Sequence, residues 1–394
     1  MERLRKIPFW FHLSAGCVAG LVILIMSVTG VLLAFQKQIT AYAERNQRFV
    51  AVPPAASRLS PEALLAALNS RRAPTNITWS SHPGAAVEVS FGRDQTLFVN
   101  PYTGAALGEG SAALRAFFHR VEDWHRWLGV SSGVREIGRG TTGACNFAFL
   151  LMICSGFYLW LPRRWPWRSV RAIFFFRGGL SGKARDFNWH NVIGLWCCVP
   201  LFLIIACSVV MSYPWANSLV YRISGSEPPK QLAPPQAQQA GTSDSSFIDT
   251  SNLSRLCALA ESKVPGWRTI SLRLPRASDP SAVFVIDSGN GGLPQNRAQL
   301  ALNRKTLAES RWETFDTYNR GRRWRFWIRF THTGEAFGFV GQFVASVAAL
   351  GGVFLVYTGL SLAIRRFLAW RARPSQTSAL RPEWSEPDPA IRET

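Results

Sequence analysis

The sequence predicts a membrane protein in which four helical spans form a bundle and two α+β domains occupy the loops outside the membrane. Two observations lead to this fold class: four long apolar segments, and two long loops between them. A helix needs about 20 apolar residues to cross a hydrocarbon core about 30 Å thick. The four segments meet this length, and they cover residues 13–35, 143–161, 191–213 and 336–363.

The remaining residues divide around these spans. In chain order we expect the N-terminus and first span, a first outer domain with a histidine segment, the second span, a basic cytoplasmic loop, the third span, a linker with a second outer domain and histidine segment, the fourth span and a cytoplasmic tail. The boundaries, in that order, are 1–36, 37–142, 143–161, 162–190, 191–213, 214–335, 336–363 and 364–394. The same unit of span, outer domain, histidine segment and span thus occurs twice, which predicts a pseudo-two-fold internal repeat.

Basic residues predict the orientation of the spans. Arg and Lys are frequent in the N-terminal segment, in the loop 162–190 and in the tail 364–394. By the positive-inside rule these segments are cytoplasmic, so both large loops lie outside. The first apolar stretch is longer than the h-region of a signal peptide, and we expect it to be retained as an anchor.

The formal net charge of +20 does not by itself indicate a nucleic-acid partner. Much of the basic excess flanks the spans, where topology and the anionic lipids of the bilayer account for it. Most cysteines lie inside the spans, where they act as small hydrophobes, and only Cys257 lies in an outer loop. No disulfide framework and no nucleic-acid partner are therefore expected.

Each outer loop reads as a helix followed by antiparallel strands. In the first loop, Ser60 as N-cap and Pro61 at the first helical position open a short helix. In the second loop, residues 249–264 read as a helix, after a Pro- and Gln-rich linker at 225–246 that has little to bury. Alternating runs predict strands at 76–80, 86–91, 95–100, 105–108, 268–274, 282–287 and 298–302.

Histidines recur at or ahead of the start of each span. His12 and His190 precede spans that run outward, whereas His125 and His332 precede spans that run inward. Ionisable groups at membrane depth are costly and mark functional sites. Imidazoles from separate helices can ligate one haem iron, so we expect one or two molecules of haem b, the outer one held by His125 and His332. The competing interpretation is that each histidine only anchors a helix end.

Two further features near His125 leave alternatives open. Residues 130–142 separate it from the apolar run, so either the helix begins before the membrane or the segment folds back along the interface. His119 lies six residues ahead of His125, which places it off the same helix face. A surface role is expected for it, and the alternative is that it ligates instead if the segment is irregular. His82 sits beside a Pro-Gly turn and is expected to be exposed.

A basic, aromatic segment at 320–329 lies on the outer side, immediately before His332. Arginine forks suit carboxylates, so Arg322 and Arg325 are candidates to bind haem propionates or an acidic iron chelate. A solvated amphipathic stretch on lipid head groups is an equally good interpretation. Haem would be held non-covalently, because the sequence has no C-x-x-C-H motif.

The order of several motifs resembles the PepSY-associated transmembrane family, which includes iron-regulated inner-membrane proteins and siderophore reductases. The matching stretches are FHL at 11–13, SVTG at 27–30, DWHRWLG at 123–129, SGFYLWLPR at 155–163, NWHNVIGLW at 188–196, SYPWAN at 212–217 and THTGEAFG at 331–338. The resemblance implies a multi-pass, haem-containing protein of the bacterial inner membrane, with two periplasmic PepSY-like domains. In the reductase branch it also implies an electron path to ferric siderophores outside.

The sequence therefore predicts a reductase that passes electrons to a ferric siderophore, or another iron chelate, in the periplasm. The electron donor is a quinol or a cytoplasmic reductant, since no convincing G-x-G-x-x-G dinucleotide motif is present. The alternative is a non-enzymatic PepSY membrane protein that acts as a transporter or as an assembly or regulatory partner. The spans offer few polar groups, such as Asn146 and Gln342, which weighs against transport of a large polar chelate.

Overall fold

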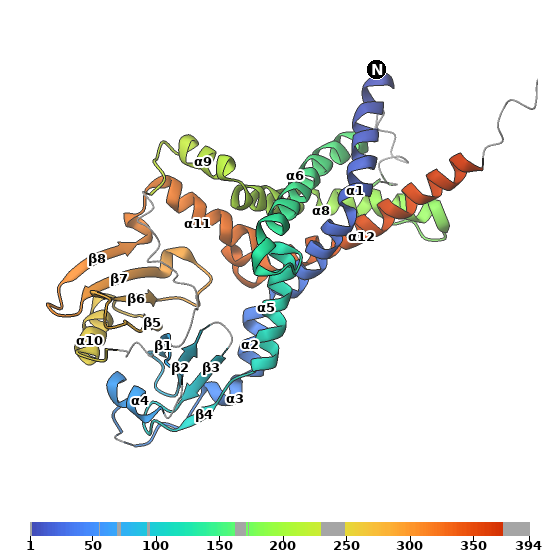
Figure 1. The fold of residues 1–394 in the computed structure, drawn as a ribbon. Coiled ribbons are helices and arrows are strands. Elements are labelled where there is room, and N and C mark those ends of the chain that lie inside the picture. Colours follow the sequence, from blue (N-terminus) through green and yellow to red (C-terminus); the bar gives the residue numbers. More distant parts are fainter. Residues whose placement is uncertain are drawn as a thin grey trace, which may run out of the picture.

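The computed structural model of the chain describes residues 2–54, 56–68, 72–92, 95–161, 171, 173–229 and 249–372. It contains a helical bundle and an antiparallel sheet that lies at one end of the bundle (Figure 1). Part of the basic loop 162–190, most of the linker 225–246 and the tail beyond residue 372 were interpreted from the sequence above but lie outside the described residues.

Four helices of the described chain are long and apolar enough to cross a membrane. The predicted spans agree with these helices to within two residues at one end, and at the other end each helix extends at least eight residues beyond the apolar run. Their bounds are α1 (Glu2–Ala34), α6 (Arg135–Trp160), α8 (Gly182–Ser212) and α12 (Gly338–Arg371).

Small side chains allow these four helices to pack closely. Helix α12 packs against α1 and α8, and α6 packs against the same two helices. A Cβ atom at Gly351 would lie 2.4 Å from Cys197 Sγ, so only glycine permits this approach of α12 to α8. Polar side chains also pair between these helices: Asn146 Nδ2 donates to Ser208 Oγ at 2.8 Å.

Two shorter helices lead from the sheet into the bundle. These are α5 (Ala112–Trp127), which precedes α6, and α11 (Arg320–His332), which precedes α12. Leu128 ends α5 in the left-handed conformation at φ 56°, and the chain then turns back into α6. Helix α6 thus begins at Arg135, ahead of the apolar run, and His125 lies on a separate helix that packs against α1 and α6.

The strands of both loops form a single eight-stranded sheet in the order β4-β3-β2-β1-β5-β6-β7-β8. Strands β1 and β5 join the two halves, with Ile77 opposite Leu272. The first loop supplies β1 (Asn76–Ser80), β2 (Val87–Phe91), β3 (Gln95–Val99) and β4 (Ala106–Gly108). The second supplies β5 (Thr269–Arg273), β6 (Ser281–Asp287), β7 (Arg297–Asn303) and β8 (Glu309–Thr314).

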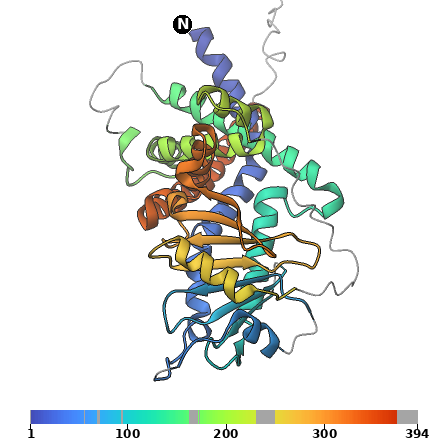
Figure 2. The ribbon, with the colours of Figure 1, turned by 90° about the vertical axis from the view of Figure 1, so that its left-hand side faces the viewer.

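The predicted strands are confirmed, and β8 is an additional strand that the sequence analysis missed. Its residues are mostly polar because β8 is an edge strand, and only Trp312 packs against the core. One face of the sheet is covered by α4 (Pro61–Ala67) and α10 (Leu253–Lys263), and Figure 2 shows α10 lying across the strands. The predicted cap is present, since Ala63 N donates to Ser60 Oγ at 3.1 Å.

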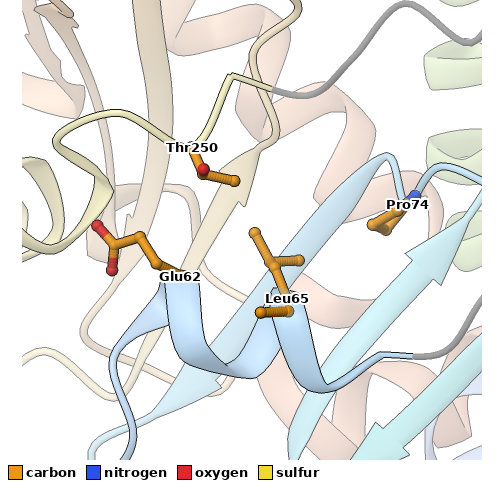
Figure 3. A pocket seen from close by; sticks show the side chains of 5 residues that line it. Glu62, Leu65, Pro74 and Thr250 are labelled. Carbon is orange, nitrogen blue, oxygen red and sulfur yellow. The ribbon is translucent and has the colours of Figure 1, made fainter.

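Helices α4 and α10 come from different loops and are linked by a carboxylate. Glu62 Oε1 accepts from the backbone N of Ser254 at 2.6 Å, and its second oxygen accepts from the Ser254 hydroxyl. Burial opposes ionisation of Glu62, but these hydrogen bonds outweigh it and hold its pKa below the usual value. Beside Glu62 a small surface pocket is lined by Leu65, Pro74 and Thr250 (Figure 3).

The remaining helices connect the bundle to the sheet. Helices α2 (Gln36–Ala43) and α3 (Arg45–Arg48) continue from α1, and α9 (Pro214–Ile223) follows α8 and packs against α11. Gly321 permits this last contact, because a Cβ atom there would lie 2.3 Å from Tyr221 Cδ1.

Candidate functional site

The structure brings the four predicted histidines together in two pairs. His125 on α5 and His332 on α11 form the sheet-side pair, whose ring centroids are 6.3 Å apart. His12 on α1 and His190 on α8 form the distal pair, whose ring centroids are 6.2 Å apart. Each pair therefore joins two helices that are far apart in the sequence.

The two pairs occupy separate layers of the bundle. Helix α1 contacts both pairs, through His12 at one layer and through Thr29, the partner of His125, at the other. These two residues are about 25 Å apart along the helix axis at a rise of 1.5 Å per residue. An apolar cluster that includes Ala19, Ile23 and Phe149 fills the bundle core. Two layers with apolar packing between them match the arrangement that the histidine positions predict.

The spacing within each pair suits a shared metal. Imidazole nitrogens bind first-row metals at about 2.0–2.1 Å, so two rings on opposite sides of one ion have centres about 6 Å apart. Among the described residues, no group of three or more His, Cys, Asp or Glu side chains is placed to hold a metal ion. A site with two protein ligands suits a metal whose other positions a macrocycle fills, as in haem.

Each imidazole is oriented by a hydrogen bond between its Nδ1 and a group on a neighbouring helix. Three of the partners are hydroxyls and the fourth is a backbone carbonyl. The pairs are His12 with Ser155 Oγ at 3.1 Å, His125 with Thr29 Oγ1 at 2.9 Å, His190 with Thr358 Oγ1 at 2.9 Å and His332 with Ile204 O at 3.0 Å.

These contacts define which nitrogen carries the proton. A carbonyl only accepts, so His332 is protonated on Nδ1. Thr29 Oγ1 and Thr358 Oγ1 each donate their proton to a carbonyl of their own helix at 2.7 Å, and Ser155 Oγ does so at 3.1 Å. Each hydroxyl is thus placed to accept from the imidazole, a tautomer that would leave the Nε2 lone pair of all four rings for a ligand bond.

Glycines beside the hydroxyls make room for the rings. Gly30, Gly156 and Gly359 directly follow the three hydroxyl residues, and Cβ atoms there would lie 3.5, 3.0 and 3.3 Å from the Cε1 atoms of His125, His12 and His190. The orienting role of these residues is not predicted from the sequence. The recurring signal is a Ser-Gly or Thr-Gly pair inside an apolar helix.

The orienting hydroxyl gives a testable prediction. Thr358→Val keeps the side-chain shape but removes the acceptor of His190, and we expect the distal pair to bind haem about 10–100-fold more weakly. Thr141→Val is the matched control, because Thr141 also donates to a carbonyl four residues earlier but is exposed. Haem titration of the two purified variants checks this, and equal affinities would show that the hydroxyl has no such role.

The two candidate arginines have different surroundings. Arg322 donates to the Glu313 carboxylate at 3.0 and 3.3 Å, and its guanidinium lies 3.7 Å from the Tyr318 ring centroid. Arg325 lies seven residues before His332 on α11 and has a buried Nη1 without a hydrogen-bond partner among the described residues. Arg325 is thus the better candidate to bind an anionic group.

The other two histidines lie apart from the pairs. His119 Nδ1 is 3.9 Å from Glu122 Oε2, one turn along α5, and its side chain is partly buried. His82 is exposed in the sheet region, as the sequence predicts, and its ring packs against Phe49.

Comparison with known proteins places the bundle in a family. The family model described as the PepSY-associated TM region matches residues 9–366. The match thus contains both histidine pairs and every strand of the sheet. No curated protein matches the chain.

Proposed function

The chain belongs to the PepSY-associated transmembrane family, and we propose that it is a haem-containing reductase of the bacterial inner membrane. In this proposal it passes electrons across the membrane to ferric siderophore iron in the periplasm. The observation that supports the proposal most strongly is the pair of histidine layers: all four Nδ1 atoms are hydrogen-bonded, and none of the hydrogen bonds among the described residues involves an Nε2 atom of these rings.

The residues present fit haem b held without covalent bonds. His125 and His332 would hold one haem and His12 and His190 a second, and Arg325 would bind a propionate of the first. Bound haem supplies one-electron chemistry, and the protein supplies ligation, orientation and an apolar surrounding that tunes its potential. Helices from both halves of the chain contribute to each pair.

The internal repeat supports this assignment. The unit α1, α5 and α6 corresponds to the unit α8, α11 and α12, and His12 and His125 then correspond to His190 and His332. In both units the last helix orients the distal histidine, through Ser155 and Thr358. A pseudo-two-fold axis between the units would account for the similarity of the two histidine pairs. The eight-stranded sheet, which is joined through β1 and β5, would then be a fusion of two PepSY-like domains.

The expected topology sets the direction of electron flow. Both termini and the distal pair lie on the cytoplasmic side, and the sheet and the sheet-side pair lie on the periplasmic side. A quinol or a cytoplasmic reductant supplies the electrons. If a quinol does so, it becomes a quinone, releases two protons and reduces two ferric ions by one electron each. Hard oxygen donors bind the resulting Fe²⁺ less tightly, so the metal leaves the chelate.

Electron delivery tests the proposal directly. In proteoliposomes that contain the full chain, we expect dithionite to reduce the haem and an added ferric siderophore to reoxidise it. The absorption spectrum of the haem follows both changes. Gallium-loaded siderophore is the matched control, because Ga³⁺ has the charge of Fe³⁺ but accepts no electron under these conditions. A colourless protein, or haem that stays reduced with the ferric chelate, would favour the non-enzymatic role of transporter or assembly partner.

Arg325 gives a second prediction. We expect Arg325→Gln to lower retention of the sheet-side haem about tenfold, because a hydrogen bond to a charged group is worth about 1.5–3 kcal/mol. Arg320→Gln on the same helix is the control, since Arg320 is exposed. Haem loss to apomyoglobin measures retention, and equal loss rates for both variants would remove Arg325 from the site.

A further inference from the structure

Each helix that carries a histidine of the sheet-side pair has an arginine–carboxylate pair that leads to the sheet, directly for α11 and through Arg48 for α5. On α5, Arg115 Nε and Nη2 donate to the two oxygens of Glu44, both at 2.7 Å. On α11, Arg322 Nη1 and Nη2 make a similar bidentate contact with the two oxygens of Glu313. Each arginine lies ten residues before the histidine on its helix, Arg115 before His125 and Arg322 before His332.

The first of these pairs is built around a buried carboxylate. The Glu44 side chain is 0% exposed, and it also accepts from Arg48 Nη2 at 2.9 Å and from the Ser111 backbone N at 3.2 Å. Burial opposes ionisation of Glu44, but the hydrogen bonds from Arg115, Ser111 and Arg48 outweigh it and lower its pKa. A buried charge with this many fixed donors holds one geometry.

The Glu44 pair reaches the sheet through Arg48. Arg48 Nη1 donates to Glu88 on strand β2 at 2.6 Å. The start of α5 is therefore connected to β2 by a chain of three ion pairs: Arg115 with Glu44, Glu44 with Arg48, and Arg48 with Glu88.

The second pair reaches strand β8, which is an edge of the same sheet. Glu313 belongs to strand β8 and also accepts from Arg311 at 2.6 Å. Partial burial opposes its ionisation, but Arg322 and Arg311 together lower its pKa. Strands β1, β5, β6 and β7 lie between β2 and β8 without a break in the pairing, so the sheet fixes the distance between the two attachment points (Figure 1).

We propose that these two ion pairs, Glu44–Arg115 and Glu313–Arg322, make the sheet a spacer that sets the separation and angle of the sheet-side histidines. The proposal rests on the proposed function, in which that pair holds haem. Ten helical residues span about 15 Å, so a tilt at the arginine end of α5 or α11 moves the imidazole at the other end. Arg115 and Arg322 are thus proposed as positioning residues, because each lies ten residues before the histidine that it would help to place.

The test compares Arg115→Gln and Arg322→Gln in the full chain. Arg115→Lys is the conservative variant, because lysine keeps the positive charge but cannot make the bidentate contact with Glu44. Lys263→Gln is the control, since Lys263 on α10 makes an exposed ion pair with Glu309 on β8 and contacts neither α5 nor α11 through that pair. Hydrogen exchange of α5 and α11 is measured without haem, and the electron paramagnetic resonance spectrum and midpoint potential of each haem are measured with it.

We expect about tenfold faster exchange at the start of the affected helix in each Gln variant. The signal of the sheet-side haem shifts while that of the distal haem stays unchanged, and Arg115→Lys gives an intermediate effect. Wild-type exchange and wild-type haem signals in both Gln variants would overturn the proposal. If wild-type protein binds no haem, the proposed function fails, and the exchange of α5 and α11 still decides whether the ion pairs fix these helices.

Discussion

His332→Ala is expected to remove one haem from each chain and to abolish reduction of an external ferric siderophore. The substitution deletes one of two imidazoles whose ring centres are 6.3 Å apart, and His125 alone provides a single axial ligand. The distal pair keeps both of its imidazoles and their Nδ1 contacts. Haem quantification by the pyridine haemochrome assay, together with a reoxidation assay, measures both effects.

His190→Ala provides the converse experiment. It should remove the distal haem and leave the sheet-side haem in place, where it can still exchange an electron with an external chelate but no longer receives one from the cytoplasmic side. His82→Ala controls for loss of a histidine as such, because His82 is exposed in the sheet region. Full haem content in both His332→Ala and His190→Ala would contradict the ligand assignment.

Gly138→Ala is expected to separate α5 from α6 and to displace His125. A Cβ atom at position 138 would lie 2.2 Å from the backbone oxygen of Trp127, and a backbone atom cannot rotate away as a side chain can. Overpacking of this kind costs about 1–3 kcal/mol, so we expect lower thermal stability in detergent and loss of the sheet-side haem.

Gly140→Ala is the matched control for this prediction. It makes the same change two residues further along α6, where nothing lies within 4 Å of the added Cβ atom. Helix propensity alone should make that variant equal to wild type or slightly more stable. If the two variants have the same melting temperature and haem content, the close contact of α5 with α6 does not position His125.

Patterns that are local in sequence made much of the fold predictable. The four apolar runs predicted the four long helices, and alternating residues predicted every strand except β8. Strand β8 was missed because an edge strand buries one side, and here only Trp312 contacts the core. The union of both loops in one sheet depends on pairing between Ile77 and Leu272, which no local pattern encodes.

The same limit applied to the candidate site. Histidine positions relative to the spans were enough to predict the two layers and their pairing. The partners of Nδ1 were not predictable, because Thr29 and Thr358 look like ordinary hydroxyls in apolar helices until the tertiary contacts are known. Arg322 and Arg325 were equivalent in the sequence, and their tertiary contacts separate them: Arg322 binds Glu313 on β8, whereas Arg325 has a buried Nη1 without a hydrogen-bond partner among the described residues.

The haem content of the purified full chain, measured with its optical and paramagnetic resonance spectra, tests the central claim most directly. We predict two low-spin haem b molecules per chain, with two different midpoint potentials and signals typical of two imidazole ligands. A protein that binds no haem after expression in haem-sufficient cells, or one whose haem signals survive replacement of all four paired histidines, would contradict it.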